Sequence, residues 1–455
     1  MIQFLLRKPV TVLFISFAIA ILIGALLLEL PFSTTKDIPF LDALFTSTSA
    51  VCVTGLIVTD TGTTFTLFGQ TVVLFLIQIG GLGIMTAGAF VFLVLKKVGV
   101  KAGAGLKIIL EEDYISGVKR ATRFIIISTI VIELIGAGLL YLEWNRMSLL
   151  ETGQLAFSAL FHSIAAFCNA GFSLFQDNLT GFRGDVATNL IFYSLITLGG
   201  IGFLVLEDVY GSIVLFLKNP RFHFKPRFHV HQKIRLTLHS KIVLISTLVI
   251  ILTGASLFYF FEKDNLSYLS QKELILSSFF QTITSRTAGF NTVDIGALTS
   301  PTLLLLIIVM FIGAAPTSTA GGIKVTSLAI IILSIVAFIK GRHDIVIFGR
   351  TIPRVQMKNV FILVASYLIF CLVIFFLMLY TEKGIFEKIL FEIFSAMGTV
   401  GLSTGITPYL TDLGKVLIIL TMFVGRILPL SIAILGAKKL IEPSIVLPEE
   451  KVILG

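Results

Sequence analysis

Charged residues are scarce in this sequence. Only 13% of its 455 residues are Asp, Glu, Lys or Arg, whereas 56% are hydrophobic, and the mean hydropathy is +1.00. Soluble domains carry roughly 25% charged residues, so this composition excludes a water-soluble globular protein. We expect lipid to be the solvent for most of the chain.

Motifs for covalent, metal or nucleotide chemistry are also lacking. The three cysteines, Cys52, Cys168 and Cys371, lie in apolar segments without paired spacing, so neither disulfides nor a metal cluster are expected. No glycine-rich nucleotide or phosphate loop is found, and the notable acids, Glu133 and Glu207-Asp208, form no catalytic pair. We therefore expect no enzyme and no cofactor in this chain. Four histidines are interpreted as part of a solvated basic connection rather than a metal site: His223, His229, His231 and His239.

Apolar stretches of the roughly 20 residues needed to cross a bilayer recur along the whole chain. The first, residues 9–30, lacks a small-residue cleavage site and is followed by further such stretches, so we interpret it as a retained helix. The net charge of +9 is concentrated in connections near residues 96–123, 218–241 and 340–358 and in the tail. Basic connections face the cytoplasm, which predicts a multi-pass plasma-membrane protein with both termini inside and does not indicate nucleic acid.

A fourfold repeat organises the chain. Each unit has an apolar helix, a segment of about 13 apolar residues too short to cross, a glycine loop and a second long helix. The glycines of the four loops lie 116, 118 and 112 residues apart. The loops are Val53-Thr54-Gly55, Asn169-Ala170-Gly171, Thr287-Ala288-Gly289 and Thr399-Val400-Gly401. We predict an all-α membrane protein with four helix–pore-loop–helix repeats around one central pore, comprising eight transmembrane helices and four re-entrant pore helices.

The expected domain boundaries follow the repeats and the basic connections. The units are repeat 1 at 1–97, a cytosolic loop at 98–121, repeat 2 at 122–217, a cytosolic loop at 218–241, repeat 3 at 242–339, a cytosolic loop at 340–358, repeat 4 at 359–440 and a cytosolic tail at 441–455.

The glycine loops predict a selectivity filter. Backbone that leaves a helix at membrane depth needs a protein or water environment for its carbonyls, and a ring of carbonyls can replace the hydration shell of a monovalent cation. Glycine allows the backbone angles that turn carbonyls inward. One glycine could equally serve helix packing, but four in register favour a filter. We keep packing as the interpretation of Gly80, Gly81, Gly83, Gly199, Gly200 and Gly202.

A gate is predicted in repeat 3, where residues 301–339 are too long for one crossing and are interrupted by Pro316 and small residues. The segment should unwind there, either as a gate or as a passive kink. The candidate gate residues are Gly313, Ala314, Ala315, Thr317, Ser318, Thr319, Gly321, Gly322, Lys324 and Arg426. Arg426 lies within the fourth inner helix, where a cation is a functional candidate, with pairing to Glu133 as the alternative. We expect Arg286 to turn behind its loop and His162 to pack in the core.

On these residues, above all the four glycine loops and the stretch 313–324, the sequence resembles the Trk/Ktr/HKT superfamily of potassium transporters over essentially its whole length. It starts directly with the first repeat and so is more similar to the Ktr membrane subunit, KtrB, than to Trk. The resemblance implies potassium uptake, since serine at the position of Gly55 is associated with sodium permeation. It also implies an intramembrane gating loop at 313–324 that works with Arg426.

The resemblance further implies a homodimer and a cytosolic ring of nucleotide-binding regulatory subunits (KtrA-like). Potassium is the implied permeant ion, with sodium left open as an activator or coupled ion. The basic connections are either docking surfaces or topology signals. Two other functions stay open: a secondary transporter of another small solute, for which two repeats would be typical, and a sodium-permeable cation transporter. The residues do not distinguish a gated channel from a coupled transporter.

Overall fold

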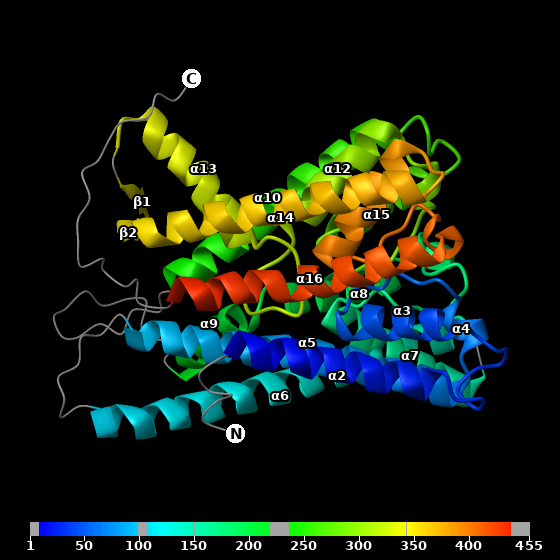
Figure 1. The fold of residues 1–455 in the computed structure, drawn as a ribbon, viewed down its shortest axis with the longest axis horizontal. Helices are drawn as coiled ribbons and strands as arrows, with labels where there is room; N and C mark the ends of the chain where they lie inside the picture. The colour runs from blue at the N-terminus through cyan, green and yellow to red at the C-terminus, as the bar shows by residue number, and fades with distance from the viewer. Residues whose placement is uncertain (1–8, 99–106, 149–150, 219–235, 343, 438–455) are drawn as a thin grey trace.

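The computed structural model describes residues 9–98, 107–148, 151–218, 236–342 and 344–437. In this part of the chain the fold is a bundle of helices that run mainly along its long axis (Figure 1). Six of the helices are long and apolar enough to cross a membrane. They are α2 (Pro9–Leu28), α5 (Leu67–Val98), α6 (Lys107–Arg146), α10 (Leu238–Glu262), α14 (Arg354–Thr381) and α16 (Asp412–Ala437).

Two further apolar stretches are interrupted. Helices α8 (Val186–Gly200) and α9 (Phe203–Lys218) meet at an angle of 105° and would form a seventh crossing if counted together. Helices α12 (Ser300–Ile312) and α13 (Val325–Ile339) are separated by the non-helical residues 313–324. The predicted number of eight crossings requires both pairs to count as single interrupted crossings, and it stays a prediction.

Four shorter helices each pack against the long helix that precedes them and end at one of the glycine loops. They are α3 (Phe40–Val51), α7 (Thr152–Cys168), α11 (Gln271–Thr284) and α15 (Phe386–Gly398). Figure 1 shows α3, α7 and α15 together in one half of the bundle. We call these four the pore helices. Their loops therefore end inside the bundle rather than at its surface.

The outward faces of the long helices are apolar. The six spans have a mean hydropathy of 1.9 to 3.0, yet at most 39% of the residues in each span are buried. Leu22, Leu134 and Phe376 are among the exposed side chains, at 52%, 60% and 63%. Such a large apolar surface requires hydrocarbon around it. The chain is a multi-pass membrane protein, and the predicted helical class is confirmed.

Two of the predicted cytosolic loops contain regular structure. Residues 340–358 include a hairpin of β1 (Ile345–Ile347) and β2 (Arg350–Ile352). Its turn, Phe348-Gly349, has φ of 49° and 72°, the conformation of a tight two-residue hairpin. Helix α6 begins at Lys107, inside the expected loop 98–121, so that connection is partly helical.

An ion pair joins the beginning and the end of the bundle. Lys415 of α16 lies 2.5 Å from the Asp42 carboxylate of α3, and both side chains are largely buried, with exposed fractions of 13% and 11%. The two residues are 373 positions apart in sequence. Their contact joins α16, which follows the last glycine loop, to the first pore helix, α3.

Candidate ion pathway

The four glycine loops share one backbone conformation. In each, a non-glycine residue with left-handed φ is followed two positions later by a glycine with positive φ. The φ values are 54° and 95° for Val53 and Gly55, 58° and 69° for Asn169 and Gly171, 79° and 80° for Thr287 and Gly289, and 49° and 94° for Thr399 and Gly401. A non-glycine residue with positive φ is uncommon, so the recurrence at matching positions indicates one loop design used four times.

The four glycines meet in a closed circle. A Cβ atom added to Gly171 would lie 3.0 Å from the Ala288 carbonyl oxygen and 3.0 Å from Gly289 Cα. The same holds around the circle, where a Cβ on each glycine would meet the carbonyl that precedes the next glycine. These contacts run from Gly55 to Ala170, from Gly289 to Val400 and from Gly401 to Thr54. Four backbone carbonyls from four distant segments therefore surround one point.

The loop amides point away from this circle, because their N–H groups donate into the preceding pore helix at 2.7–2.8 Å. The pairs are Thr54 with Ser49, Ala170 with Ala165, Ala288 with Thr284 and Val400 with Ser395. Within the described residues, no hydrogen bond ends on the carbonyl oxygens of Thr54, Ala170, Ala288 or Val400. Unpaired carbonyls in buried backbone need a polar partner, and a dehydrated cation can be one.

Glycines on the inner helices bring those helices against the pore helices. A Cβ on Gly80, Gly199 or Gly425 would collide with a carbonyl in the last turn of a pore helix, those of Val51, Phe167 and Met397. Close packing is thus what the structure shows for Gly80 and Gly199. Gly202 is different: its φ is 83°, it lies at the bend between α8 and α9, and a Cβ there would meet the Pro316 carbonyl at 2.5 Å. The prediction of tight helix packing is therefore corrected for Gly202, which lies between two helices and packs closely against residues 313–324.

Residues 313–324, which we call the gating loop after the role predicted for them from the sequence, run close to the glycine circle. The Thr319 hydroxyl lies 3.2 Å from the carbonyl oxygens of Phe167 and Gly199 in the second unit. On the other side, a Cβ on Gly321 would meet the Thr399 hydroxyl in the fourth loop. Residues 313–324 therefore contact both neighbouring units and lie next to two of the glycine loops.

Arg426 holds the gating loop from α16. Its side chain is buried; Nη1 donates to the Thr319 carbonyl at 2.5 Å and Nη2 donates to the Gly80 carbonyl of α5 at 3.0 Å. Lys324 Nζ adds bonds to the carbonyls of Ala320 and Gly321, at 2.6 and 3.1 Å. Two cationic groups are thus bound to loop carbonyls, where a free carbonyl would otherwise attract an ion.

The alternative partner for Arg426, Glu133, lies elsewhere. Its carboxylate accepts a hydrogen bond from Gln78 Nε2 at 3.2 Å, and among the described residues Arg426 forms no ion pair. Arg286 is buried and donates to the Thr247 hydroxyl of α10 at 3.2 Å, so it turns behind its loop. His162 is buried beside Trp144.

Metal-ligating side chains do not gather in the described part of the chain, where no three His, Cys, Asp or Glu residues could hold an ion together. Of the clustered histidines, His223, His229 and His231 lie outside the described residues.

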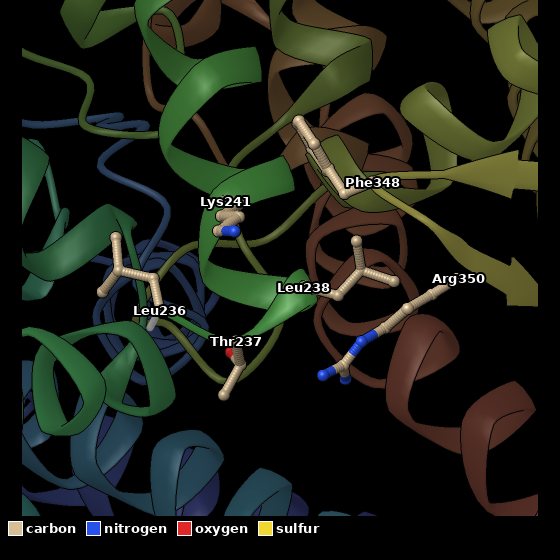
Figure 2. A pocket seen from close by; sticks show the side chains of 6 residues that line it. All are labelled: Leu236, Thr237, Leu238, Lys241, Phe348 and Arg350. Carbon is tan, nitrogen blue, oxygen red and sulfur yellow. The ribbon is translucent and has the colours of Figure 1, made fainter. Parts of the chain in front are cut away.

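A cavity of about 190 Å³ lies at the other end of the bundle, between the start of α10 and the β-hairpin. Figure 2 shows its lining of Leu236, Thr237, Leu238, Lys241, Phe348 and Arg350. Lys241 Nζ is 5.5 Å from the centre of the Phe348 ring. Figure 1 places the hairpin away from the pore helices, so this cavity is separate from the glycine circle.

Long helices with apolar outer faces and four glycine loops that meet in a circle of carbonyls define a multi-pass membrane protein of the re-entrant-loop class. The chain belongs to the TrkH family of cation transport proteins, whose family model matches residues 3–447. The resemblance found in the sequence is therefore confirmed.

Several known proteins are similar along nearly their whole length. The Ktr system potassium uptake protein B of Bacillus subtilis is 41% identical over 432 residues, which cover 94% of this chain and 93% of the relative. The potassium/sodium uptake protein NtpJ of Enterococcus hirae is 35% identical and covers 98% of this chain and 97% of its own length. The crystal structure of the potassium transporter TrkH from Vibrio parahaemolyticus has a TM-score of 0.71 over 93% of this chain and 83% of that chain; at 20% identity this shows the fold.

Proposed function

We propose that this protein takes up potassium across the cell membrane through the circle of four glycine loops. The observation that carries the proposal is the closed sequence of contacts from Gly55 through Gly171 and Gly289 to Gly401 and back to Thr54. Each loop supplies one carbonyl without a hydrogen-bond partner in the described residues, and a carbonyl ring suits a dehydrated monovalent cation. The names of the B. subtilis and V. parahaemolyticus proteins support potassium as that cation.

The filter is assigned to the twelve loop residues predicted from the sequence, 53–55, 169–171, 287–289 and 399–401. The buried hydroxyls of Thr54, Thr287 and Thr399 have no hydrogen-bond partner among the described residues. Thr399 lies against Gly321 of the gating loop, which supports a role for its hydroxyl in binding the ion where the ion leaves the ring. A buried hydroxyl without a hydrogen-bond partner costs free energy, and binding to a passing cation would offset that cost.

The gate is assigned to residues 313–324 together with Arg426. Gly313 and Gly322 have φ of 60° and 67° and lie against each other, so both ends of the loop use conformations that glycine adopts without strain. Opening would break the bonds from Arg426 and Lys324 to the loop carbonyls and move the loop away from Thr399. The positive charge of Arg426 adds an electrostatic barrier for a cation while the loop is in place.

Four pore units with eight crossings and cytoplasmic termini complete the proposal, with the boundaries predicted from the sequence. The B. subtilis relative is named as one lettered protein of a Ktr system, which supports a regulatory partner. We assign this role to a cytosolic nucleotide-binding ring and the assembly to a homodimer. The name of the E. hirae protein includes sodium, which favours sodium as the alternative permeant or activating ion.

The test is growth at low potassium of cells that lack their own potassium uptake systems. The intact chain should restore growth, alone or with a regulatory partner, and Gly401→Asp should abolish it. Gly55→Ser should admit sodium. Gly138→Ala is the matched control, because a Cβ at Gly138 has nothing within 4 Å. If Gly401→Asp leaves uptake unchanged at normal protein levels, the circle is not the ion path and a solute site elsewhere takes its place.

A further inference from the structure

One position in each pore helix lies behind the filter. Near the end of each pore helix, one backbone carbonyl accepts the N–H of the glycine loop; these carbonyls belong to Ser49, Ala165, Thr284 and Ser395. The position behind the filter is three residues before each of them. The residues at this position are Thr46, His162, Gln281 and Glu392, and all are buried, with at most 1% exposed. We call them the bracing positions. They carry four different side chains, so we compared what each one holds.

Glu392 holds the chain that leaves the fourth loop. Its Oε1 accepts hydrogen bonds from Ser403 Oγ at 2.6 Å, from the Thr404 N–H at 2.9 Å and from Thr404 Oγ1 at 3.2 Å. Its Oε2 accepts from Thr407 Oγ1 at 2.8 Å. All the donors come from residues 403–407, directly after Gly401. One carboxylate therefore fixes the outer side of this loop with four bonds.

His162 does the same in the second loop with fewer bonds. Its Nδ1 lies 2.7 Å from the Ser158 carbonyl and must carry the proton there, which leaves Nε2 as an acceptor. Nε2 then accepts from the Leu174 N–H at 3.3 Å and from Ser173 Oγ at 3.1 Å. Ser173 and Leu174 follow Gly171 as Ser403 and Thr404 follow Gly401.

The other two bracing positions hold less. Gln281 Nε2 reaches Thr292 Oγ1 after the third loop at 3.5 Å, the limit of a hydrogen bond. The Thr46 hydroxyl donates to the Asp42 carbonyl of its own helix at 2.9 Å and does not reach the chain after Gly55. The bracing is therefore strongest in the fourth loop and absent at this position in the first.

We propose that Glu392 is a positioning residue that sets ion specificity, by holding residues 403–407 so that the fourth loop keeps its carbonyl at a radius that suits potassium and not sodium. This inference rests on the proposed function. Four hydrogen bonds converge on Glu392, whereas His162 accepts two and Gln281 makes one, so we expect the fourth loop to be the most firmly held of the four. Gly401 contacts both neighbours, with a Cβ on Gly289 lying 3.2 Å from Gly401 Cα and a Cβ on Gly401 meeting the Thr54 carbonyl. Its placement therefore constrains the whole ring.

The experiment measures potassium uptake in proteoliposomes that contain the complete protein, and the sodium concentration that inhibits it. Glu392→Ala should lower the preference for potassium over sodium by about tenfold, the equivalent of one hydrogen bond. Glu392→Gln should have a preference between those of the intact protein and Glu392→Ala, because the amide oxygen can still accept a hydrogen bond from Thr404. Glu387→Gln is the matched control: it is the same change on the same helix, and its carboxylate bonds Ser300 at 2.9 Å rather than the loop. Thr46→Val should also leave the preference unchanged.

The outcomes separate this inference from the function on which it rests. A folded Glu392→Ala protein with the preference of the intact chain overturns the bracing role and leaves the uptake function standing. An intact chain that takes up no potassium with any partner overturns the function itself. If Glu392→Ala is not recovered at normal amounts, Ser403→Ala decides, because it removes one donor and leaves the other three. A shifted preference in Ser403→Ala supports the inference, and an unchanged one overturns it.

Discussion

The four glycine loops are alike in backbone conformation, whereas the helical segments that follow them differ from one another. The loops have one backbone conformation, with paired positive φ values in all four. The inner helices share no such design. Helix α5 is continuous, α8 and α9 meet at 105°, α12 and α13 are separated by residues 313–324, and α16 is continuous with Arg426 in it.

This difference separates two physical demands. A dehydrated cation needs equivalent oxygens on all sides, so an asymmetric ring would bind it poorly. A gate needs one element that moves and others that hold still, so it benefits from unequal helices. The glycine loops, where the ion would be held, therefore keep one conformation, whereas the helices that follow them, where passage would be controlled, differ from unit to unit.

The largest effect is expected from breaking the equivalence of the loops. Gly171→Ala would place a Cβ 3.0 Å from the Ala288 carbonyl on a backbone with φ of 69°. Strain of about 3 kcal/mol should reduce rubidium uptake by roughly a hundredfold. Gly153→Ala is the control, since a Cβ there meets nothing within 4 Å. Equal uptake by both variants would mean that the ring tolerates asymmetry.

A smaller effect of opposite sign is expected from the inner helices. Arg426→Gln removes the bonds to Thr319 and Gly80 and untethers the gating loop. A hydrogen bond from a charged group contributes about 1.5 kcal/mol or more, so rubidium uptake should rise about tenfold. Lys358→Gln, an exposed charge change, should have no effect. Reduced uptake by folded Arg426→Gln protein would contradict a restraining role.

The closure between the first and last repeats should affect stability more than transport. Lys415→Ala leaves the Asp42 carboxylate largely buried without its partner at 2.5 Å. Removing one partner of a buried pair costs about 3 kcal/mol, which should appear as a lower melting temperature in detergent. The double variant Asp42→Ala/Lys415→Ala should recover part of the loss. A double variant as unstable as the two single changes combined would show that the pair itself does not couple these helices.

The smallest effect is expected outside both regions. Arg354 and Asp344, beside the hairpin, form an ion pair at 3.2 Å with side chains 69% and 53% exposed. Solvent screens such a pair, so Arg354→Ala should change stability by less than about 1 kcal/mol and leave uptake unchanged. A large loss of uptake in this variant would assign a transport or docking role to the hairpin.

Local patterns in the sequence were enough to predict the loops and the interruption of repeat 3. Gly55, Gly171, Gly289 and Gly401 stand where positive φ and close backbone contact exclude other residues, so the requirement is visible in the sequence. Pro316 and its small neighbours mark the unwound segment for a similar reason.

Other features left little or no local pattern. His162, Gln281 and Glu392 stand at the same position of three pore helices but are three different side chains with unequal hydrogen bonding, so the repeat does not reveal them. The pairing of Asp42 with Lys415 depends on tertiary packing between the chain's two ends. The hairpin did have a signal, since three β-branched residues, Ile345-Val346-Ile347, come just before Phe348-Gly349. The long apolar helices around it outweighed this short signal.

The contact between Lys415 and Asp42 has a consequence for biosynthesis. A membrane protein is made and inserted from its N-terminus, and the two halves of this ion pair emerge 373 residues apart. The last gap in the ring, between Gly401 and Thr54, is bounded by the same first and last units. A partly translated chain therefore cannot close the ring, so the ring can form only after residues 313–324 and Arg426 have been made.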